Sequence, residues 1–401
     1  MLSAVADAKI VFRPMPTAHF GTGAIGALPG TVRDTGGEVA VIVTDPALAG
    51  TPVLPAVAGA LATGGIPATV FAGVQPNPTT DDVAAGAAEV AALAAAGHRV
   101  TLVAVGGGSP IDAAKGIALA AVNPERGRDL DYRRAFAAAA LPIVAVPTTA
   151  GTGAETNAFG VVTDPQTQRK FYVGHASSLP AAAILDPELT VGLPPQATAA
   201  TGMDALIHAL ESYLSRRANP WSDGIALQVI RMIGANLPRA FADAGDREAR
   251  AQMLLAAHLA GVGMASTGLG VCHAIGHSLG ARFGIAHGMA LTLVLPHVLA
   301  FNREACEERL ADVAFALGAG ETARTAAGNA GAAIEAITGL RDSLGLARRP
   351  SDFGVVAGDF AQISADALDD EVLASTPRMP TSADIIAILA AAQGQGGELC
   401  R

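Results

Sequence analysis

The sequence predicts an α/β domain with a mostly parallel sheet, followed by an all-helical domain. The chain has 401 residues, which is too long for one ordinary hydrophobic core. Up to about Leu193, short apolar runs alternate with Ala-rich helical segments, and this alternation favours parallel strands covered by helices on both faces. Beyond that point the apolar periodicity is helical almost to the end. We therefore expect two domains, residues 1–193 and 194–401.

The strands of the first domain are expected where Val, Ile or Leu runs end in turn residues. They are predicted at 9–14, Glu38–Asp45, 67–73, the start of 98–122, 141–147, within 163–174, and 181–187. Helices are predicted between them. The segment HFGTGAIGAL begins with turn residues and leads into a helix through TVRDTG, and the others cover 52–65, 81–97 and the end of 98–122. In the second domain, helices are predicted over 194–220, 221–241, 247–266, 307–318 and 383–393.

Composition excludes several classes of protein. The formal net charge is −10 without a Lys or Arg run, so we expect no nucleic-acid partner. Three cysteines without zinc-knuckle spacing indicate a reduced, cytoplasmic protein. The N-terminus lacks the apolar core of a signal peptide. Pro296 and His297 interrupt the apolar stretch 289–301, and we expect no membrane span.

A glycine-rich turn between a strand and a helix is the first candidate site. In VAVGGGSPIDAAK, Gly107 and Gly108 allow close backbone approach to a pyrophosphate, and Ser109 adds a hydroxyl. The alternative is an ordinary turn with Ser109 as the helix N-cap. Two other predicted strand ends carry polar groups, at Thr44–Asp45 and Thr148–Thr149, and ligands of open α/β sheets bind where strand ends meet.

The acidic residue of this candidate site lies in an unusual place. In the common dinucleotide fingerprint an acid follows the glycines by about twenty residues. Here the best acidic candidate, Asp45, comes before them. If Asp45 holds an adenosine ribose, its charge favours NAD over NADP. The alternative is that Asp45 caps the helix that starts at Pro46.

A cluster of histidines is the second candidate site. His273 and His277 are four residues apart on a predicted helix, and His287 follows ten residues later. Asp204 and His208 show the same four-residue spacing on another helix. One carboxylate and several imidazoles suit a divalent metal, but spacing neither selects the ligands among the three later histidines nor decides between iron and zinc. Four histidines without useful spacing are interpreted as structural or surface residues, and His297 is a candidate for a position just outside the ligands. These four are His19, His98, His175 and His258.

These motifs together resemble the iron-containing (group III) alcohol dehydrogenase family. The resemblance covers nearly the whole chain through VTDPAL, GGGSPIDAAK, PTTAGTGAETN, ILDPELTVGLP, GMDALIHALESY, GVCHAIGHSLGARFGIAHG and PRMPTSADIIAIL. It implies an N-terminal dinucleotide-binding domain and a helical, metal-binding catalytic domain. By the same resemblance Asp204, His208, His273 and His287 hold Fe²⁺, with Zn²⁺ as the alternative ion. His277 is then a catalytic residue beside the nicotinamide. The dinucleotide contacts implied are Asp45, Gly107, Gly108, Ser109, Asp112, Thr148, Thr149, Asn157, Lys170, Leu189 and His277.

The resemblance also implies an activity. A metal that polarises the substrate oxygen promotes hydride transfer between a small alcohol or aldehyde and NAD. His277 is then placed to relay a proton or orient the ring. Phe159 and Met264 are candidates for lining an apolar substrate pocket, and a homodimer is expected. The identity of the alcohol is not encoded in any motif.

Three rival functions share part of this pattern. A maleylacetate-type reductase has a similar fold without the metal, but the intact Asp204–His208 pair argues against it. A glycerol-dehydrogenase or dehydroquinate-synthase type is less well matched by GMDALIHALESY and PTTAGTGAETN. A binding protein without turnover is disfavoured by the combination of glycine loop and histidine cluster.

Overall fold

The computed structural model describes residues 10, 15–126, 128–166 and 169–394. The chain divides into two compact units, with one change of unit between Leu193 and Pro194. The predicted strand at 9–14 falls, apart from Ile10, outside the described residues. Each unit is described by itself.

The first unit is built on a six-stranded sheet in which every pair of neighbours is parallel. The strand order is β1-β8-β5-β4-β2-β3. The parallel α/β prediction is confirmed. The strands are β1 Thr17–Phe20, β2 Val39–Val43, β3 Ala68–Phe71, β4 Val100–Gly106, β5 Ile143–Pro147 and β8 Ala182–Leu185.

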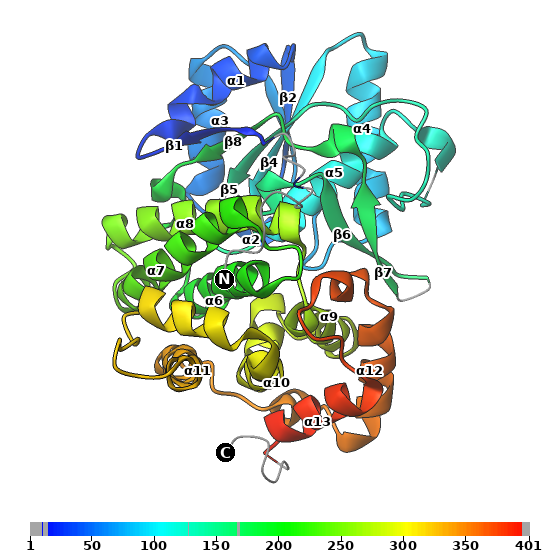
Figure 1. The fold of residues 1–401 in the computed structure, drawn as a ribbon. Coiled ribbons are helices and arrows are strands. Elements are labelled where there is room, and N and C mark those ends of the chain that lie inside the picture. The colour runs from blue at the N-terminus through cyan, green and yellow to red at the C-terminus, as the bar shows by residue number, and fades with distance from the viewer. Residues whose placement is uncertain (1–9, 11–14, 127, 167–168, 395–401) are drawn as a thin grey trace. The chain divides into compact units, whose positions relative to one another are not determined.

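Alternate residues of the central strands enter two separate hydrophobic cores. On β2, Val41 and Val43 belong to one core, whereas Ala40 and Ile42 belong to the other. Helices α4 and α5 contribute to the first core, and α1 and α3 contribute to the second, so both faces of the sheet are covered (Figure 1). The helices of this unit are α1 Leu28–Asp34, α2 Pro46–Ala49, α3 Val53–Thr63, α4 Thr80–Ala95 and α5 Gly108–Ala120.

The strand order reverses between β2 and β4. From β2 the chain moves outward to β3, returns beside β2 as β4, and then continues in the opposite direction through β5. Ligands of open α/β sheets bind at the carboxyl ends of strands at such a switch point. The segments that leave β2, β4 and β5 begin with Thr44, Gly107 and Thr148, so the predicted polar loops follow adjacent strands.

Two strands were not predicted. β1 ends in His19 and Phe20, where HFGTGAIGAL predicts turn residues instead. Its four residues are mostly exposed and show no apolar run, but pairing with the buried strand β8 stabilises β1 at the sheet edge. β6 Phe159–Asp164 pairs antiparallel with β7 Arg169–Gly174 in a separate two-stranded sheet. Only β7 was anticipated, since β6 follows directly on the Thr- and Gly-rich loop.

The second unit is helical, as predicted, and no strand occurs among residues 194–394. Its longest helix, α10, continues through Pro296 and departs from helical geometry at Cys306 (φ −133°, ψ 20°). Cys272 and Cys306 are buried and unpaired. The helices are α6 Pro195–Leu214, α7 Pro220–Ala242, α8 Arg247–Thr267, α9 Val271–Phe283, α10 His287–Ala316, α11 Ala326–Ser343, α12 Phe360–Asp369 and α13 Ser382–Ala392.

Within the described ranges, no individual helix has both the length and the apolar character needed to cross a membrane. Helices α8 and α9 meet that test of length and composition only as a pair, bent by 107°.

A buried lysine fastens the glycine loop helix to the segment that follows β5. The Lys115 side chain on α5 is fully buried, and its ammonium donates to the Ala154 carbonyl (2.7 Å), to Asn157 Oδ1 (3.2 Å) and to the Phe159 carbonyl. Asp112 lies one turn earlier, with an oxygen 3.6 Å from the ammonium. Burial lowers the pKa of Lys115, and the Asp112 charge opposes that effect. Each ammonium hydrogen therefore has a partner, as a buried cation requires.

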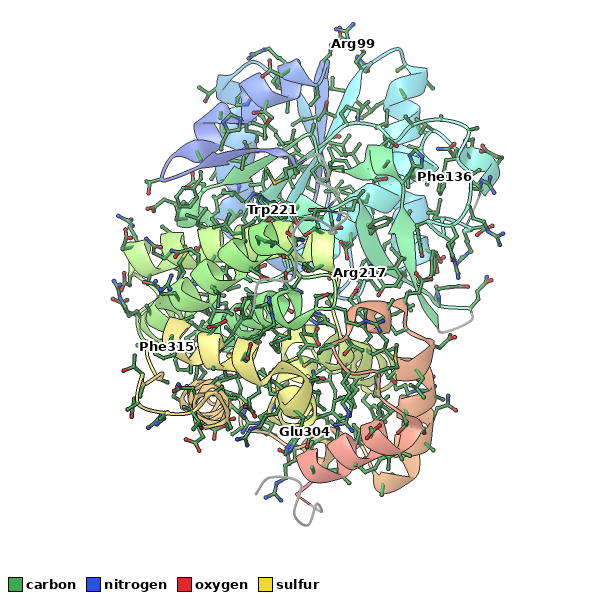
Figure 2. The ribbon with its side chains drawn as sticks, viewed as in Figure 1. Arg99, Phe136, Arg217, Trp221, Glu304 and Phe315 are labelled. Atoms are coloured by element: carbon green, nitrogen blue, oxygen red, sulfur yellow. The ribbon has the colours of Figure 1, made fainter. Side chains whose placement is uncertain are left out.

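We expect Lys115→Met to lower the free energy of unfolding by about 3 kcal/mol or more, because the substitution leaves two carbonyls and the half-buried Asp112 carboxylate without their cation. Arg99→Met is the matched control. Arg99, labelled in Figure 2, pairs with Glu38 at 2.8 Å, but its side chain is 70% exposed. Loss of an exposed pair costs less than about 1 kcal/mol. Urea unfolding of both variants measures the difference, and equal losses would contradict the role of burial.

Candidate metal centre

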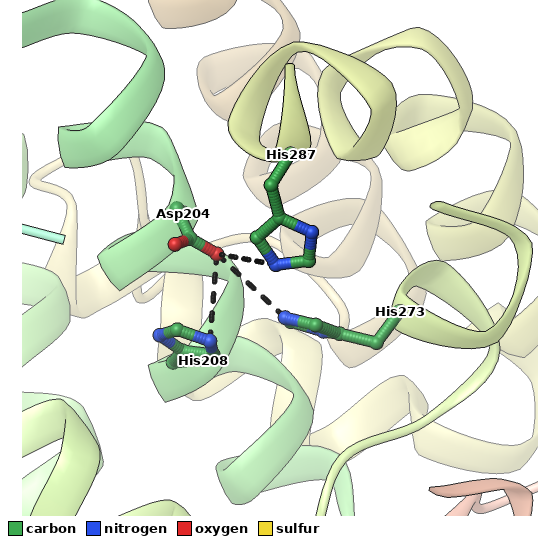
Figure 3. A group of neighbouring side chains, drawn as sticks. All are labelled: Asp204, His208, His273 and His287. Carbon is green, nitrogen blue, oxygen red and sulfur yellow. Dashed lines mark ion pairs between the residues drawn. The ribbon is translucent and has the colours of Figure 1, made fainter. Parts of the chain in front are cut away.

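Four side chains from three helices converge on one point in the second unit (Figure 3). Asp204 and His208 stand one turn apart on α6, as their spacing predicted. His273 comes from the first turn of α9, and His287 is the first residue of α10. One donor atom from each residue lies within 4.8 Å of all the others.

The distances fit a shared ion better than direct hydrogen bonds. Asp204 Oδ1 lies 3.4 Å from His208 Nε2, and 3.6 Å from both His273 Nε2 and His287 Nε2. These separations exceed the usual length of a charged N–H···O hydrogen bond. Metal–ligand bonds of about 2.1 Å at tetrahedral angles would separate neighbouring donor atoms by about 3.4 Å. The donor set is thus spaced for a divalent cation at its centre.

Burial supports the same interpretation. Asp204 is 2% exposed and His273 is 1% exposed, yet Asp204 Oδ1 and His273 Nε2 have no hydrogen-bond partner. Buried polar atoms without partners are rare because they cost free energy. Burial by itself would raise the pKa of Asp204, but the imidazoles of His208, His287 and His273 hold it well below its usual range. Asp204 is therefore a carboxylate at neutral pH, ready to bind a cation.

Close packing of two helices brings His287 to the centre. Its neighbour Gly288 lies against α6 so tightly that a Cβ there would come within 2.2 Å of the Ala200 carbonyl oxygen. Only glycine permits this approach of α10 to α6. The His287 side chain is 40% exposed, whereas the other three side chains of the group are buried.

Glu211, which no sequence motif predicted as a site residue, fixes the orientation of His273. Its Oε2 lies 2.6 Å from His273 Nδ1 and accepts from the Gly270 amide (2.9 Å), while Oε1 accepts from the Cys272 amide (2.8 Å). Glu211 thereby directs His273 Nε2 toward Asp204, as outer carboxylates do for metal-binding histidines. Burial would lower the pKa of His273, but Glu211 and Asp204 raise it to about 9. The sequence does contain a signal for Glu211, since Asp204, His208 and Glu211 follow an i, i+4, i+7 pattern and so share one face of a helix.

His277 touches the cluster without joining it. Its ring stacks on His287 at 5.5 Å between centroids and lies 5.8 Å from the His273 ring, but none of its nitrogens belongs to the four-donor group. Its Nδ1 instead lies 2.7 Å from Asp370 Oδ2. The fourth histidine of this region, His297, lies ten residues beyond His287 on α10, about 15 Å along the axis, and its position just outside the ligands stays a prediction.

The candidate dinucleotide residues lie in the first unit, except His277, which lies on α9 of the second unit. Gly107, not Ser109, is the N-cap of α5, and no side chain caps that helix. Its first amides are therefore available to an anion. A Cβ on Gly108 would approach Thr152 to 3.0 Å, so the glycine turn packs against the loop after β5. The Thr148 amide donates to the Gly106 carbonyl at 3.0 Å and holds this loop beside β4.

Other predicted dinucleotide contacts also have structural roles. Asp45 caps α2 through Oδ1, which accepts from the Leu48 amide at 2.8 Å. Asp112 Oδ2 accepts from the Val161 amide at 2.9 Å. Lys170 donates to Asn77 Oδ1 at 2.9 Å. Asn157 and Leu189 also have structural roles: Asn157 accepts a hydrogen bond from Lys115, and Leu189 is buried in a core of the sheet. Contact between any of these residues and a dinucleotide stays a prediction.

The two proposed pocket residues belong to different units. Phe159 on β6 is 42% exposed and packs edge-on against Tyr132, with 5.4 Å between ring centroids. Met264 is half-buried on α8.

Comparison with known proteins identifies the family. A profile described as iron-containing alcohol dehydrogenase matches residues 16–187, and one described as Fe-containing alcohol dehydrogenase family, C-terminal, matches residues 198–393. This chain belongs to the iron-containing alcohol dehydrogenase family. The resemblance predicted from the motifs is confirmed, and the protein is an oxidoreductase of the alcohol dehydrogenase type.

Relatives of this iron-containing alcohol dehydrogenase match it over nearly their whole length. The probable alcohol dehydrogenase EutG of Salmonella typhimurium is 38% identical over 95% of this chain and 94% of its own. The NAD-dependent methanol dehydrogenase of Bacillus methanolicus is 35% identical over 93% and 97%. A solved structure of 1,3-propanediol oxidoreductase is 36% identical, with a TM-score of 0.91 over 96% of this chain and 100% of its own.

We expect Glu211→Gln to weaken metal binding by about 10- to 100-fold. All three partners of Glu211 donate hydrogen bonds, so an amide N–H₂ must face at least one of them and the His273 ring loses its fixed orientation. Competition with a chelator measures the affinity of the metal-stripped protein for Zn²⁺. Glu248→Gln, on α8, is the control for loss of a glutamate elsewhere in this unit. Equal affinities of the two variants would contradict the role of Glu211.

Proposed function

We propose that this protein is a metal-dependent alcohol dehydrogenase and aldehyde reductase that transfers hydride between a small alcohol and NAD. The observation that carries the proposal is the convergence of Asp204, His208, His273 and His287 around a buried carboxylate oxygen without a hydrogen-bond partner. We assign these four residues as ligands of Fe²⁺, as the family implies, and the same donors suit Zn²⁺.

The metal-free, maleylacetate-type alternative and the glycerol-dehydrogenase or dehydroquinate-synthase alternative are less well supported. The complete donor set favours metal dependence. The near full-length matches to alcohol dehydrogenases favour alcohol oxidation over both alternatives.

When bound, the metal supplies Lewis acidity toward the substrate oxygen and so lowers the pKa of the alcohol. The protein residues contribute position and charge. Glu211 holds His273 so that Nε2 faces Asp204, and the Asp204 carboxylate compensates part of the cation charge. We expect the substrate to approach beside His287, because its side chain is the exposed one of the four. We assign His277, beside His287, to the exchange of the alcohol proton.

We propose that NAD binds at the strand ends of the first unit. The uncapped N-terminus of α5, with Gly107, Gly108 and Ser109, offers amides to the pyrophosphate. Asp45 follows the strand next to β4 and uses only Oδ1 as a cap, which supports ribose binding through Oδ2. The name of the Bacillus methanolicus relative supports NAD as cosubstrate.

We also propose a compartment and partners for this protein. The acidic composition supports a protein without nucleic-acid partners. The unpaired, buried Cys272 and Cys306 support a reducing compartment, the cytoplasm. We propose that the protein is a homodimer, as the family resemblance implies, and that it is not attached to a membrane.

The central test is alcohol-dependent NAD reduction with a panel of small alcohols, diols and aldehydes. We expect activity in the metal-reconstituted protein, and a loss of at least about 100-fold on metal stripping, in Asp204→Ala and in His273→Ala, because each removes the polarising ion. Re-addition of metal should restore the stripped wild type but not the variants. Activity that survives stripping and both substitutions would overturn metal dependence.

The cosubstrate assignment has its own test. We expect a higher kcat/KM with NAD than with NADP, and Asp45→Asn should raise the NADP-to-NAD ratio about tenfold or more, because it removes the charge that repels the extra phosphate. Asparagine retains the cap of α2, so unfolding stability should change little. Equal use of both cosubstrates by the wild type, or an unchanged ratio in the variant, would rule out this role of Asp45.

A further inference from the structure

His277 is held by a carboxylate from a distant part of the chain. Asp370 ends α12 and caps the short helix η9, Glu371–Ser375. Its Oδ2 lies 2.7 Å from His277 Nδ1, and its Oδ1 accepts from the Val372 amide at 3.1 Å. The side chains are only 21% and 13% exposed. Both carboxylate oxygens are therefore committed to fixed partners.

This pairing determines which ring nitrogen carries the proton. Burial would raise the pKa of Asp370, but the hydrogen bond and charge of His277 hold the pKa below its usual value. An ionised carboxylate only accepts hydrogen bonds, so His277 Nδ1 is the protonated nitrogen of the pair. In the neutral ring Nε2 then keeps its lone pair. The ring carrying that nitrogen stacks on His287, a candidate ligand.

A neighbouring carboxylate provides a natural comparison. Asp366 lies one turn before Asp370 on α12, and it also binds α9, through Ser278 (2.9 Å) and Arg282. Asp366 and Asp370 thus hold the same two helices together. Of the two, only Asp370 hydrogen-bonds to His277.

We propose that Asp370 is a positioning residue that fixes the orientation and tautomer of His277, so that Nε2 is the nitrogen that takes the alcohol proton. This inference rests on the proposed function. The proton moves from the substrate hydroxyl to His277 Nε2 as hydride leaves the substrate carbon for NAD, so the electron pair and proton are both accounted for. Asp370 keeps its negative charge and stabilises the imidazolium that forms.

Asparagine at position 370 should reverse the tautomer. The Val372 amide still needs an acceptor, which keeps the asparagine oxygen on that side and turns the N–H₂ toward His277. Nδ1 must then accept, and the proton moves to Nε2, where it blocks uptake of the alcohol proton. Asp370→Ser is a second variant, because a serine hydroxyl still caps η9 but does not reach the ring.

The experiment compares the holoenzymes of the wild type, Asp370→Asn, Asp370→Ser, Asp366→Asn, His277→Ala and the double variant His277→Ala/Asp370→Asn. We expect Asp370→Asn to lower kcat about tenfold or more with little change in KM for NAD, and Asp366→Asn to lower it less than about threefold. In the His277→Ala background, Asp370→Asn should cause no further loss, as expected for two residues that act as one unit. Equal losses in Asp366→Asn, or an undiminished loss in the His277→Ala background, would overturn the inference.

A spectroscopic readout separates this inference from the proposed function. In Zn²⁺-reconstituted protein with ¹⁵N-labelled histidine, the His277 signals are those absent from His277→Ala. We expect Nδ1 to be protonated in the wild type and Nε2 in Asp370→Asn. An unchanged tautomer would refute the inference even in an active enzyme. If the wild type turns over no alcohol, the proposed function is wrong. His277 then transfers no alcohol proton, and the inference about Asp370 is wrong as well.

Discussion

The buried carboxylate of Asp204 is the constraint on which the second unit depends. An ionised oxygen that is removed from water without a hydrogen-bond partner costs several kcal/mol unless a cation compensates it. Asp204 Oδ1 is such an atom, and three imidazole nitrogens surround it at 3.4 to 3.6 Å. Under the proposed function, a cation bound by this donor set would stabilise the folded protein, and folding would be coupled to metal binding.

Glycines make the convergence of the three helices possible. Gly288 allows α10 to approach the backbone of α6, and Gly276 allows α9 to approach Leu291 of α10. At the start of α9, Gly270 leaves room for the Glu211 carboxylate and donates a hydrogen bond to it. The same carboxylate orients His273. A side chain at any of these positions would force neighbouring atoms apart. The precision of the donor set is therefore a property of backbone packing as much as of the donors.

The first unit is stabilised mainly by apolar packing and not by a charged group. Parallel strands need no charged residue to assemble, and their two faces are almost entirely apolar. Polar residues follow the carboxyl ends of β2 and β5, and α5 begins after β4 without a side-chain cap. Lys115 on α5 is a fully buried cation, and its full set of partners keeps the glycine turn and the loop after β5 together.

The sequence alone determined the class of fold, the parallel sheet, the helical second half and the family, because hydrophobic periodicity and local motifs record these properties directly. It also placed Asp204 and His208 on one helix face, since a four-residue spacing needs no tertiary information. It did not reveal β1, whose stability comes from pairing with β8 at the sheet edge. Only the tertiary structure showed Glu211 behind His273 and Asp370 behind His277. His277 and Asp370 are 93 positions apart in the sequence, so no local spacing connects them, and only the docking of α12 on α9 brings the two side chains together.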